Sequence, residues 1–436
     1  MAGMTPLESR TPDVAIVGAG ALGLMTALEL ATRGLRPVVL ERGADVLSGC
    51  SAGSAGLLSP AHSTPLTTPA AVREGLRHML RRDSPFSMRP RPKLVPWLLR
   101  FILAARTDLV GRGTALIRDF SIASLEHHKR LAAEGLDTGL ELLGALNAYE
   151  TEQAYAAGIA EAAELSLEGI KSQVMSPEEV RQFEPALSDG VVGGVFYPDE
   201  GQCDPERFMR AVADAAVERG AVLCTRAEVL NAEVVDRRVV GLDTTIGKLM
   251  PDQVVVANGA WTVELSRQLG LRIPVEGGKG YHVDLRPAST DPKVPVYLQE
   301  ARVIATPYDS HLRLAGTLQL TGLSMRLDDV RVRATLTSGM RTLRGIGEGR
   351  VIGVWRGIRP CTPDGLPILG RSGRIQNAVF ATGHAMKGLH LAPETGRVIS
   401  RVVLGEDPGR DLSAFSPDRF LLRPPTRGRD SKGEGG

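Results

Sequence analysis

Between Asp13 and Gly43 the hydrophobic positions change from a continuous run to helical spacing and back again. The run VAIVG has no polar alternation, which predicts a strand buried on both faces. The next segment, ALGLMTALELATRG, is apolar at helical spacing, and Gly34 is typical of a residue that ends a helix. PVVLE predicts another strand, so the stretch as a whole predicts a strand, a helix and a strand.

Further along the chain the pattern changes twice. Residues 85–165 show helical spacing with charged positions among the apolar ones, and Pro205 suits the first turn of another helix. Between 272 and 352 the predicted strands GYHVDL, VPVYLQ, RVIATPY and HLRLAGTLQL have no segment of helical length between them, which predicts an antiparallel sheet. The section 353–405 ends with a strand, AVFAT, and a helix.

These elements predict the fold class α/β plus α+β. A discontinuous, Rossmann-like nucleotide-binding domain takes pieces from both ends and from the middle of the chain. The insertions between these pieces form a second domain around an antiparallel sheet. We expect a binding site where the two domains meet, because ligand sites are common at such junctions.

Composition and charge narrow the function classes. The 436 residues carry 52 Lys and Arg against 50 Asp and Glu, and this net charge of +2 argues against broad electrostatic binding of nucleic acid. The polar N-terminus has no apolar segment typical of a signal peptide, and 421–436 is predicted to be a disordered tail. The cysteines form no CxxC pair, so we expect reduced thiols, no metal site and a cytoplasmic protein. They are Cys50, Cys203, Cys224 and Cys361.

One apolar run, LVPWLLRFILAA from Leu94 to Ala105, has two interpretations. It is far shorter than a membrane span needs, and Arg100 interrupts it. The pattern is typical of an amphipathic helix packed on a protein core. The alternative is a helix that lies on a membrane surface, which would place the protein at the inner face of the membrane.

The turn between the first strand and the first helix, GAGALG, indicates a nucleotide site. Gly18 allows the tight turn, Gly20 lets the backbone approach a pyrophosphate, and Gly23 lets the helix pack close to the strand. The helix N-terminus that follows favours phosphate groups. Glu41 ends the second strand at about the expected distance of ~20 residues, where a carboxylate binds ribose hydroxyls and repels the 2′-phosphate of NADP.

The segment GCSAGSAGLLSP, from Cys50 to Pro60, favours FAD over NAD. Small residues at this density let the backbone run close against a flat or charged group. Because they come soon after the predicted ribose-binding acid, they would follow the ligand from its pyrophosphate towards a flavin ring. The alternative is a flexible surface loop.

The sequence resembles the flavin-dependent D-amino-acid oxidase superfamily and, within it, bacterial D-amino-acid dehydrogenases and glycine oxidases. The resemblance covers most of residues 13–405, and it rests on GAGALG with Glu41-Arg42, SAGSAGLLSP, VVVANGAW, KGYHV, WRGIRPCTPDGLPILG and ATGHAMKGLHLAPETG. It implies an FAD-binding domain formed by 11–84, 168–262 and 352–412. The implied substrate domain, with an antiparallel sheet, is formed by 85–167 and 263–351.

The resemblance also implies that FAD is bound without a covalent bond, even though a cysteine lies in the flavin segment. The residues that it implies in FAD binding are Gly18, Gly20, Ala21, Leu22, Gly23, Glu41, Arg42, Cys50, Ser51, Ala55, Gly56, Leu57, Val229, Ala257, Gly259, Gly383, Met386, Gly388 and Leu389.

An amino-acid substrate is recognised first through its carboxylate, and the planar fork of an arginine gives two parallel charge-assisted hydrogen bonds. By resemblance, Arg359 in GIRP binds this carboxylate; the alternative is an arginine paired within the protein. Arg356 lies three positions earlier, so in a strand it points to the opposite face. Tyr281 matches a position where the family lines its pocket, unless it belongs to the core of the sheet.

The segment ATGHAMKGLHLAPETG is implied to lie at the pyrimidine side of the flavin. A helix that begins near Lys387 or Gly388 would direct its N–H groups and its dipole at the negative charge of the reduced ring. Lys387 would add a full positive charge, unless it is a solvated lysine. His384 is a second catalytic candidate, with a structural hydrogen bond as its alternative. Met386 stands where glycine oxidases carry an arginine, which weakens glycine as a substrate.

The implied reaction is oxidation of the CH–NH bond of a small amino acid, either a D-amino acid or a cyclic imino acid such as D-proline or hydroxyproline. Hydride passes to flavin N5, and the imine hydrolyses to a 2-oxo acid and ammonia, so positioning supplies most of the catalysis. The alternatives are a glycine- or sarcosine-type oxidase of N-methyl amino acids and the flavin subunit of a larger dehydrogenase complex. The sequence leaves open the electron acceptor (oxygen, a quinone or an electron-transfer partner) and the oligomeric state.

Overall fold

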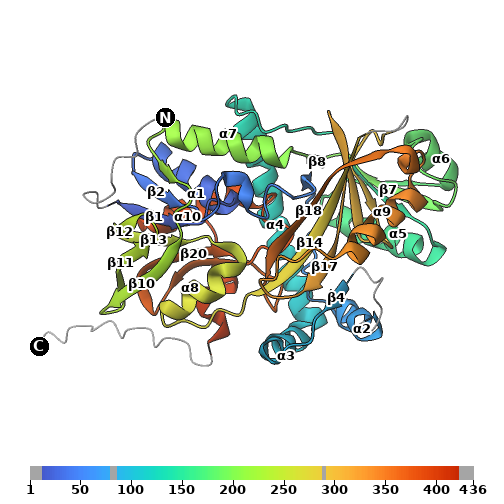
Figure 1. Ribbon diagram of the computed structural model, residues 1–436. Coiled ribbons are helices and arrows are strands. Elements are labelled where there is room, and N and C mark those ends of the chain that lie inside the picture. The colour runs from blue at the N-terminus through green and yellow to red at the C-terminus, as the bar shows by residue number, and fades with distance from the viewer. Residues whose placement is uncertain (1–11, 79–85, 287–290, 422–436) are drawn as a thin grey trace, which may run out of the picture.

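Two large β-sheets organise the structure, and hydrophobic cores pack against each of them. The computed structural model describes residues 12–78, 86–286 and 291–421. The sheet that contains β1 lies at the left of Figure 1, and the sheet that contains β14 and β17 lies to its right. Residues 422–436, which make up nearly all of the predicted disordered tail, lie outside the described residues.

The first sheet has six strands in the order β19-β20-β13-β1-β2-β9. They are β1 (Val14–Val17), β2 (Pro37–Leu40), β9 (Val222–Cys224), β13 (Gln253–Val256), β19 (Ile368–Ser372) and β20 (Ile375–Thr382). Neighbouring strands are parallel except β19 and β20. Val14 and Ile16 enter one core, while Ala15 and Val17 enter the other. This burial on both faces explains the unbroken apolar run at the start of the chain.

Helices cover one face of the first sheet, and a small sheet covers the other. The helices of the first face are α1 (Ala21–Thr32), α7 (Pro205–Glu218) and α10 (Ala392–Leu404). The second face carries β10 (Val229–Val235), β11 (Arg238–Thr244), β12 (Gly247–Leu249) and α8 (Thr262–Gln268). Asp204 caps α7 by accepting hydrogen bonds from the backbone of Glu206 and Arg207 at 2.8 and 3.1 Å, so this helix begins where the sequence predicted.

The second sheet has nine strands, with β4 placed beside β17 and the others in the order β18-β14-β17-β16-β15-β5-β7-β6. They are β4 (Phe86–Met88), β5 (Ala145–Tyr149), β6 (Gln173–Met175), β7 (Gly193–Tyr197), β14 (Glu276–Arg286), β15 (Val296–Leu298), β16 (Val303–Tyr308), β17 (His311–Leu320) and β18 (Arg350–Cys361). The predicted antiparallel pairing holds except between β15 and β5 and between β17 and β4, which are parallel. Val332 and Leu336 of α9 (Asp329–Thr342) pack on one face of this sheet.

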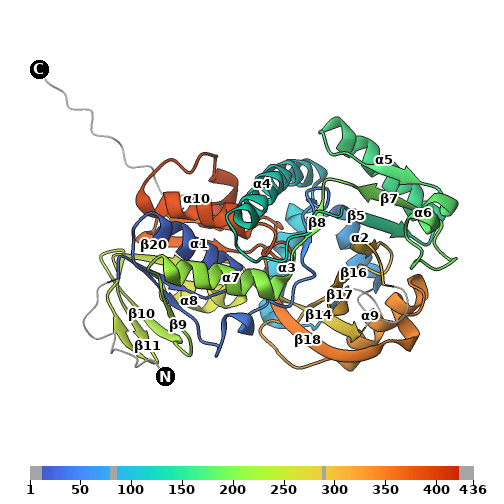
Figure 2. The same ribbon diagram turned by 90° about the horizontal axis from the view of Figure 1, so that it is seen from above.

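The remaining elements surround and join the two sheets. Strand β3 (Leu57–Leu58) pairs with β8 (Gly201–Gln202). The remaining α-helices are α2 (Pro69–His78), α3 (Val95–Ala104), α4 (Thr107–Ala133), α5 (Glu152–Leu167) and α6 (Pro177–Phe183). The short helices are η1 (Val46–Ser48), η2 (Pro92–Leu94), η3 (Gly259–Trp261), η4 (Ile346–Glu348), η5 (Ser413–Phe415) and η6 (Pro417–Phe420). Figure 2 shows α4 beside α10, at the junction of the two halves.

The domain boundaries differ from the predicted ones in three places. β6 and β7, inside the predicted FAD-binding segment 168–262, join β5 in the second sheet. β18 pairs along its length with β14, so 352–361 also belong to that sheet. α4, predicted in the substrate domain, packs Phe120, Leu125 and Leu131 into the core of the first half. The periodicity of a short segment does not show which distant segment it pairs with, so the prediction assigned these segments to the wrong domain.

Candidate functional site

The turn between β1 and α1 leaves open space around Gly20. Gly18 has φ +105°, and a Cβ there would lie 2.7 Å from the carbonyl oxygen of Ala257. A Cβ at Gly23 would lie 2.0 Å from the carbonyl oxygen of Gly18, so α1 packs very close to the turn. A Cβ at Gly20, by contrast, would meet only Ser51 Oγ within 4 Å, at 3.6 Å. The glycines therefore have the geometry predicted for a pyrophosphate-binding turn.

The N-terminus of α1 faces this space. Its N-cap residue, Gly20, provides no side-chain cap, and the first helical turn carries no acidic residue. The backbone N–H of Ala21 donates to Ser51 Oγ at 3.1 Å, which ties the helix start to the small-residue segment. Leu22 and Gly23 follow in the same first turn. Uncapped N–H groups and the helix dipole together favour an anionic group at this position.

Glu41 is held beside the glycine turn by two backbone hydrogen bonds. One carboxylate oxygen accepts from Ala19 N–H at 2.9 Å, and the other accepts from Gly43 N–H at 2.7 Å. The guanidinium of Arg42 stacks on the Trp261 ring, 3.7 Å from its centre. Glu41 thus stands at the end of β2 where the sequence placed a ribose-binding acid.

The other residues predicted near the adenosine half of the ligand lie at neighbouring strand ends. Ala227 N–H donates to the backbone carbonyl of Glu41 at 2.8 Å, which brings the start of β10 at Val229 towards this acid. Ala257 follows β13, and its N–H donates to Val17 O at 3.0 Å. Gly259, with φ +57°, opens the short helix η3. The carboxyl ends of these strands therefore meet at one edge, as in other dinucleotide-binding sheets.

Four consecutive carbonyl groups of the small-residue segment accept hydrogen bonds from side chains of the second sheet. The contacts are Arg313 Nη1 to Ala52 (3.2 Å) and Ser54 (3.0 Å), His282 Nδ1 to Gly53 (3.1 Å), and Thr306 and Tyr308 to Ala55 (2.8 and 2.9 Å). A Cβ at Gly56 would lie 2.2 Å from Cys203 O, and Leu57 pairs with Gln202. The segment is therefore fixed, and the alternative of a flexible loop is wrong.

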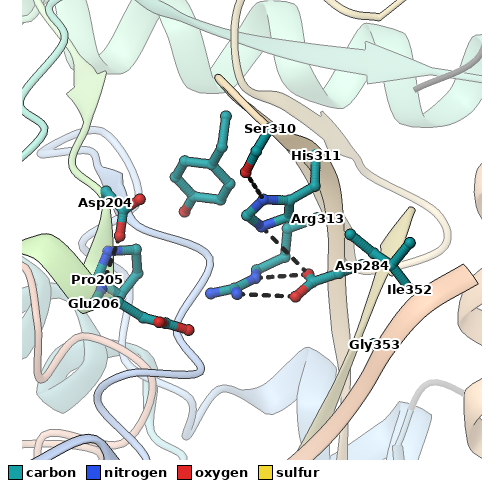
Figure 3. A pocket seen from close by; sticks show the side chains of 10 residues that line it. Asp204, Pro205, Glu206, Asp284, Ser310, His311, Arg313, Ile352 and Gly353 are labelled. Atoms are coloured by element: carbon teal, nitrogen blue, oxygen red, sulfur yellow. Dashed lines mark hydrogen bonds and ion pairs between the residues drawn. The ribbon is translucent and has the colours of Figure 1, made fainter. Parts of the chain in front are cut away.

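An ion pair organises the donors of these bonds. Arg313 binds both carboxylate oxygens of Asp284, at 2.9 and 3.0 Å, and the two side chains face each other in Figure 3. His282 and His311 approach the same carboxylate at 3.4 and 3.7 Å. Burial alone would raise the pKa of Asp284, but hydrogen bonds from His282 and Arg313 and the positive charge of Arg313 hold it well below its usual range. Arg313, Asp284 and His311 border a pocket of about 290 Å³.

Sequence reasoning did not identify the residues of this anchoring network, because they are spaced at ordinary strand positions. The one signal that could have found them is the polar alternation in GYHVDL, which puts His282 and Asp284 on the same face of the strand.

Arg359 lies on the face of the second sheet that carries this network. Its guanidinium donates to Thr317 O at 2.7 Å, and a Cβ at Gly280 would lie only 2.2 Å from its central carbon. The side chain is partly buried, and this burial lowers the pKa of the guanidinium. Among the described residues, only the thiols of Cys361 and Cys50 act to raise that pKa. None of the ion pairs within the described ranges 12–78, 86–286 and 291–421 includes Arg359. A cation without a carboxylate partner is thus placed close to the small-residue segment.

Arg356 and Tyr281 lie on the opposite face. The two are register partners across β14 and β18, whereas Arg359 pairs with Gly278. Tyr281 is fully buried, and its hydroxyl donates to Gln319 at 3.1 Å. Burial raises its pKa to about 12. The prediction that Tyr281 lines the substrate pocket is therefore wrong, because the strand turns this side chain into the interior of the sheet.

The segment from Gly383 to Leu389 connects β20 with α10. Gly383 has φ +79°, and Leu389 is buried in the core of the first half. His384 Nε2 lies 3.0 Å from Thr395 Oγ1 in α10, and burial lowers the pKa of this imidazole to about 3. His384 is thus a neutral hydrogen-bonding group, in agreement with the structural alternative. Met386 is 48% exposed.

Lys387 is half-buried and reaches a polar cluster, which argues against the alternative of a solvated lysine. Its ammonium group donates to the backbone carbonyl of His62. Burial lowers the pKa of Lys387 to about 8, against the opposing charge of Glu200. Glu200 is 2% exposed and accepts from Ala61 N–H at 2.8 Å, while its second oxygen has no partner among the described residues. Burial raises the pKa of Glu200 to about 8.

The predicted cofactor segments converge, since contacts join each to the next. Gly18 touches Ala257, Ala21 binds Ser51, and Lys387 binds His62. The open space at Gly20 and the uncapped α1 fit a pyrophosphate, and the fixed segment 52–57 fits the path towards a ring. There is also open space at Gly388, since a Cβ there would meet only His384, at 3.8 Å. Within the described part of the chain, no group of His, Cys, Asp and Glu is arranged to hold a metal ion.

Comparisons with known proteins show the family to which the chain belongs. A family model described as FAD dependent oxidoreductase matches residues 13–402. A D-amino-acid oxidase of Bradyrhizobium diazoefficiens is 30% identical over 418 residues, which covers 94% of this chain and 99% of the relative. A D-amino acid dehydrogenase of Rhizobium rhizogenes is 28% identical, over 93% of this chain and 99% of the relative. The crystal structure of glycine oxidase from Geobacillus kaustophilus superposes with a TM-score of 0.77 at 26% identity, covering 95% of this chain and all of that one.

Proposed function

Because the chain belongs to the FAD-dependent oxidoreductase family, we propose that it oxidises the CH–NH bond of a small amino acid, either a D-amino acid or a cyclic imino acid such as D-proline. The observation that carries this proposal is Arg359, a partly buried guanidinium that forms no ion pair with the described residues. A planar cation in this setting is suited to a substrate carboxylate, which it binds through two parallel hydrogen bonds.

FAD is proposed to bind without a covalent bond. Gly20 and the N-terminus of α1 would hold its pyrophosphate, and Glu41 its ribose. Residues 50–57 and 383–389 would enclose the ring. Burial raises the pKa of the Cys50 thiol, which keeps it protonated and therefore a poor nucleophile.

The residues of the chain contribute mainly by positioning. Bound FAD supplies the acceptor for the two electrons and the hydrogen that leave the substrate. Arg359 fixes the carboxylate and so the orientation of the α-carbon, which is the main requirement for such a reaction. Lys387 holds a proton at Nζ below a pH of about 8, which places a positive charge beside the segment that ends at His62. The imine of an acyclic amino acid hydrolyses in water to a 2-oxo acid and ammonia, whereas the imine of a cyclic one opens with water to a 2-oxo acid that keeps its amino group.

A second candidate is oxidation of glycine or an N-methylated glycine such as sarcosine. The 26% identity with a glycine oxidase structure over 95% of the chain favours it. Met386, exposed where glycine oxidases are expected to carry an arginine, favours the larger D-amino acids instead. The names of the curated relatives, D-amino-acid oxidase and D-amino acid dehydrogenase, support the same choice.

The proposed function is tested by anaerobic mixing of the yellow protein with single amino acids. Enantiomer pairs of alanine and proline are compared with glycine and sarcosine, and flavin absorbance is followed. We expect bleaching by the D-enantiomers and little by the others. Bleaching by dithionite but by none of the amino acids would reject the proposal. The speed with which air restores the colour then separates an oxidase from a dehydrogenase that needs a quinone, an electron-transfer partner or a larger complex.

A further inference from the structure

Helix α3 (Val95–Ala104) has apolar residues on two faces, and only one of them is covered. Leu94, just before the helix, and Trp97 and Phe101 are buried, and the two aromatic rings stack with their centres 5.1 Å apart. Trp97 Nε1 donates to Cys361 O at 3.2 Å, which fixes the helix against the end of β18. The inner face of α3 is therefore held by contacts within the protein, and these contacts do not involve its outer face.

The outer face of α3 is an exposed apolar stripe. Val95, Leu99, Ile102 and Leu103 are 52%, 58%, 51% and 72% exposed. Their spacing of four, three and one residues places them on one side of the helix. α3 lies at the lower edge of the molecule in Figure 1. Four large apolar side chains on one exposed helix face are typical of a surface that binds a membrane or another molecule.

The segment that carries the stripe is rich in positive charge. Between Phe86 and Arg112 the chain has six Lys and Arg and a single acidic residue, Asp108, although the whole chain is nearly neutral. Arg91 pairs with Glu276, while Arg106 and Arg112 pair with Asp108. Three basic residues form no ion pair with the described part of the chain; they are Arg89, Lys93 and Arg100.

A cleft beside α3 continues this basic surface. Its volume is about 840 Å³, and it is lined by five basic residues and two acidic ones. The basic residues are Arg91, Lys93, Arg100, Arg267 and Arg272, and the acidic ones are Glu264 and Glu276. A surface of this kind is complementary to anionic groups that lie in a plane next to an apolar layer.

Charge decides between the possible occupants of the stripe. A second copy of the chain in a two-fold dimer would bring the same cations of both copies together, which is unfavourable. The part of the chain that the structure describes contains no helix long and apolar enough to cross a membrane. An interfacial helix needs no such length, because it lies in the plane of the headgroups with its apolar face buried.

We propose that α3 docks this protein on the surface of an anionic lipid bilayer. Val95, Leu99, Ile102 and Leu103 enter the boundary between headgroups and acyl chains. Arg89, Lys93 and Arg100 contact the lipid phosphates. The membrane alternative for this apolar run thus explains its exposed face, and packing on the core explains its buried face. The inference does not depend on which amino acid the protein oxidises.

The test is sedimentation of the full-length, flavin-loaded protein with vesicles. One set of vesicles is pure phosphatidylcholine, and the other contains equal parts of phosphatidylcholine and phosphatidylglycerol. We expect binding only to the anionic vesicles, weakened by high salt. Leu99→Glu with Leu103→Glu should weaken binding at least tenfold, while Leu167→Glu, at a 90% exposed position at the end of α5, should leave it unchanged.

A charge variant keeps the test valid if the apolar variant folds poorly. Arg89→Glu with Lys93→Glu removes no apolar contact and should weaken binding by about fivefold or more per site. Arg36→Glu, at an exposed position just before β2, is its matched control. Binding equal to wild type in both double variants, or no binding to anionic vesicles at all, would overturn the proposal. So would a dimer in sedimentation velocity that the stripe variant dissociates, or selective binding of an acidic protein without lipid.

Discussion

The guanidinium carbon of Arg359 lies where only a glycine at position 280 can accommodate it. A Cβ on Gly280 would stand 2.2 Å from that carbon and 2.3 Å from one of its terminal nitrogens. The two residues belong to neighbouring strands, β18 and β14, and face the same side of the sheet. The missing side chain at residue 280 thus determines where the proposed carboxylate-binding group can lie.

Gly280→Ala should therefore impair substrate binding without affecting the cofactor. The methyl group displaces the guanidinium, and losing a charge-assisted hydrogen bond costs about 1.5–3 kcal/mol, which corresponds to a rise in KM of about 10- to 100-fold. Steady-state kinetics with the best substrate measure the effect. Gly353→Ala is the matched control, because its Cβ would meet nothing closer than 3.6 Å. An unchanged KM in the Gly280 variant would show that the guanidinium position does not matter.

Arg359→Lys and Tyr281→Phe should separate the two faces of the second sheet. Lysine keeps the charge but loses the planar fork, so we expect retained FAD and a KM raised at least tenfold. Tyr281→Phe removes a buried hydroxyl that donates to Gln319, so we expect unchanged kinetics and a loss of about 1 kcal/mol in the free energy of unfolding. A strong kinetic defect in Tyr281→Phe, with normal stability, would mean that Tyr281 lines the substrate pocket after all.

Arg313→Met should weaken FAD binding by releasing the segment 52–55. The substitution removes the donor to Ala52 and Ser54 and leaves Asp284 without its partner, which costs about 3–5 kcal/mol for a buried pair. Flavin fluorescence on dilution measures the dissociation constant of FAD. Arg341→Met breaks a comparable but exposed ion pair with Glu150 and should cost at most about 1 kcal/mol.

The double variant Arg313→Met with Asp284→Asn distinguishes anchoring from stability. It removes the uncompensated charge and should recover much of the melting temperature, while the affinity for FAD stays low. Equal recovery of both quantities would mean that the pair serves only the fold. A rise in FAD affinity above that of the single variant to the wild-type level would contradict the anchoring role.

Acid precipitation should release all the flavin into solution. A half-buried, protonated thiol at Cys50 does not form a covalent bond readily, so wild type and Cys50→Ser should release the same amount of FAD. Absorbance of the supernatant and of the redissolved pellet measures the two fractions. Yellow colour that remains in the wild-type pellet but not in the Cys50→Ser pellet would establish a covalent link.

The sequence predicted the local parts of this site well. The glycine turn, Glu41 and the burial of VAIVG are properties of short segments, and the structure places them as expected. Arg356 was placed correctly on the face opposite Arg359, because strand alternation is also local.

What the sequence did not predict depends on contacts between distant segments. Tyr281 could not be assigned to a face, because nothing in KGYHV shows which side of the strand is covered by α9. Arg313 lies 261 and 259 residues along the chain from Ala52 and Ser54, whose carbonyl groups it binds. Gly280 is one of several glycines in its strand, and only the position of Arg359 gives it a role. Alternation along a strand shows which residues share a face, but the pairing of strands and the packing of helices decide what each face contacts.

Buried Glu200 and half-buried Lys387 give the stability of the protein a defined dependence on pH. The pKa of Glu200 is raised from 4.5 to about 8, so between these values the folded protein keeps a proton that the unfolded chain has lost. The free energy of unfolding therefore falls as pH rises through this window, by about 1.4 kcal/mol per pH unit from this group. Lys387 acts in a different window: its pKa is lowered from 10.5 to about 8, so stability rises with pH between about 8 and 10.5.

Glu200→Gln should remove the first of these dependences. Its free energy of unfolding, from urea titration with saturating FAD, should equal that of wild type near pH 4.5 and exceed it increasingly up to about pH 8. Lys387→Met should show the reverse, with its largest gain below pH 8 and none above about 10.5. Glu264→Gln, at an exposed position, is the control. If the curves of wild type and Glu200→Gln stay parallel from pH 4.5 to 8, Glu200 is ionised in the folded protein, and the buried cluster holds a full salt bridge with Lys387.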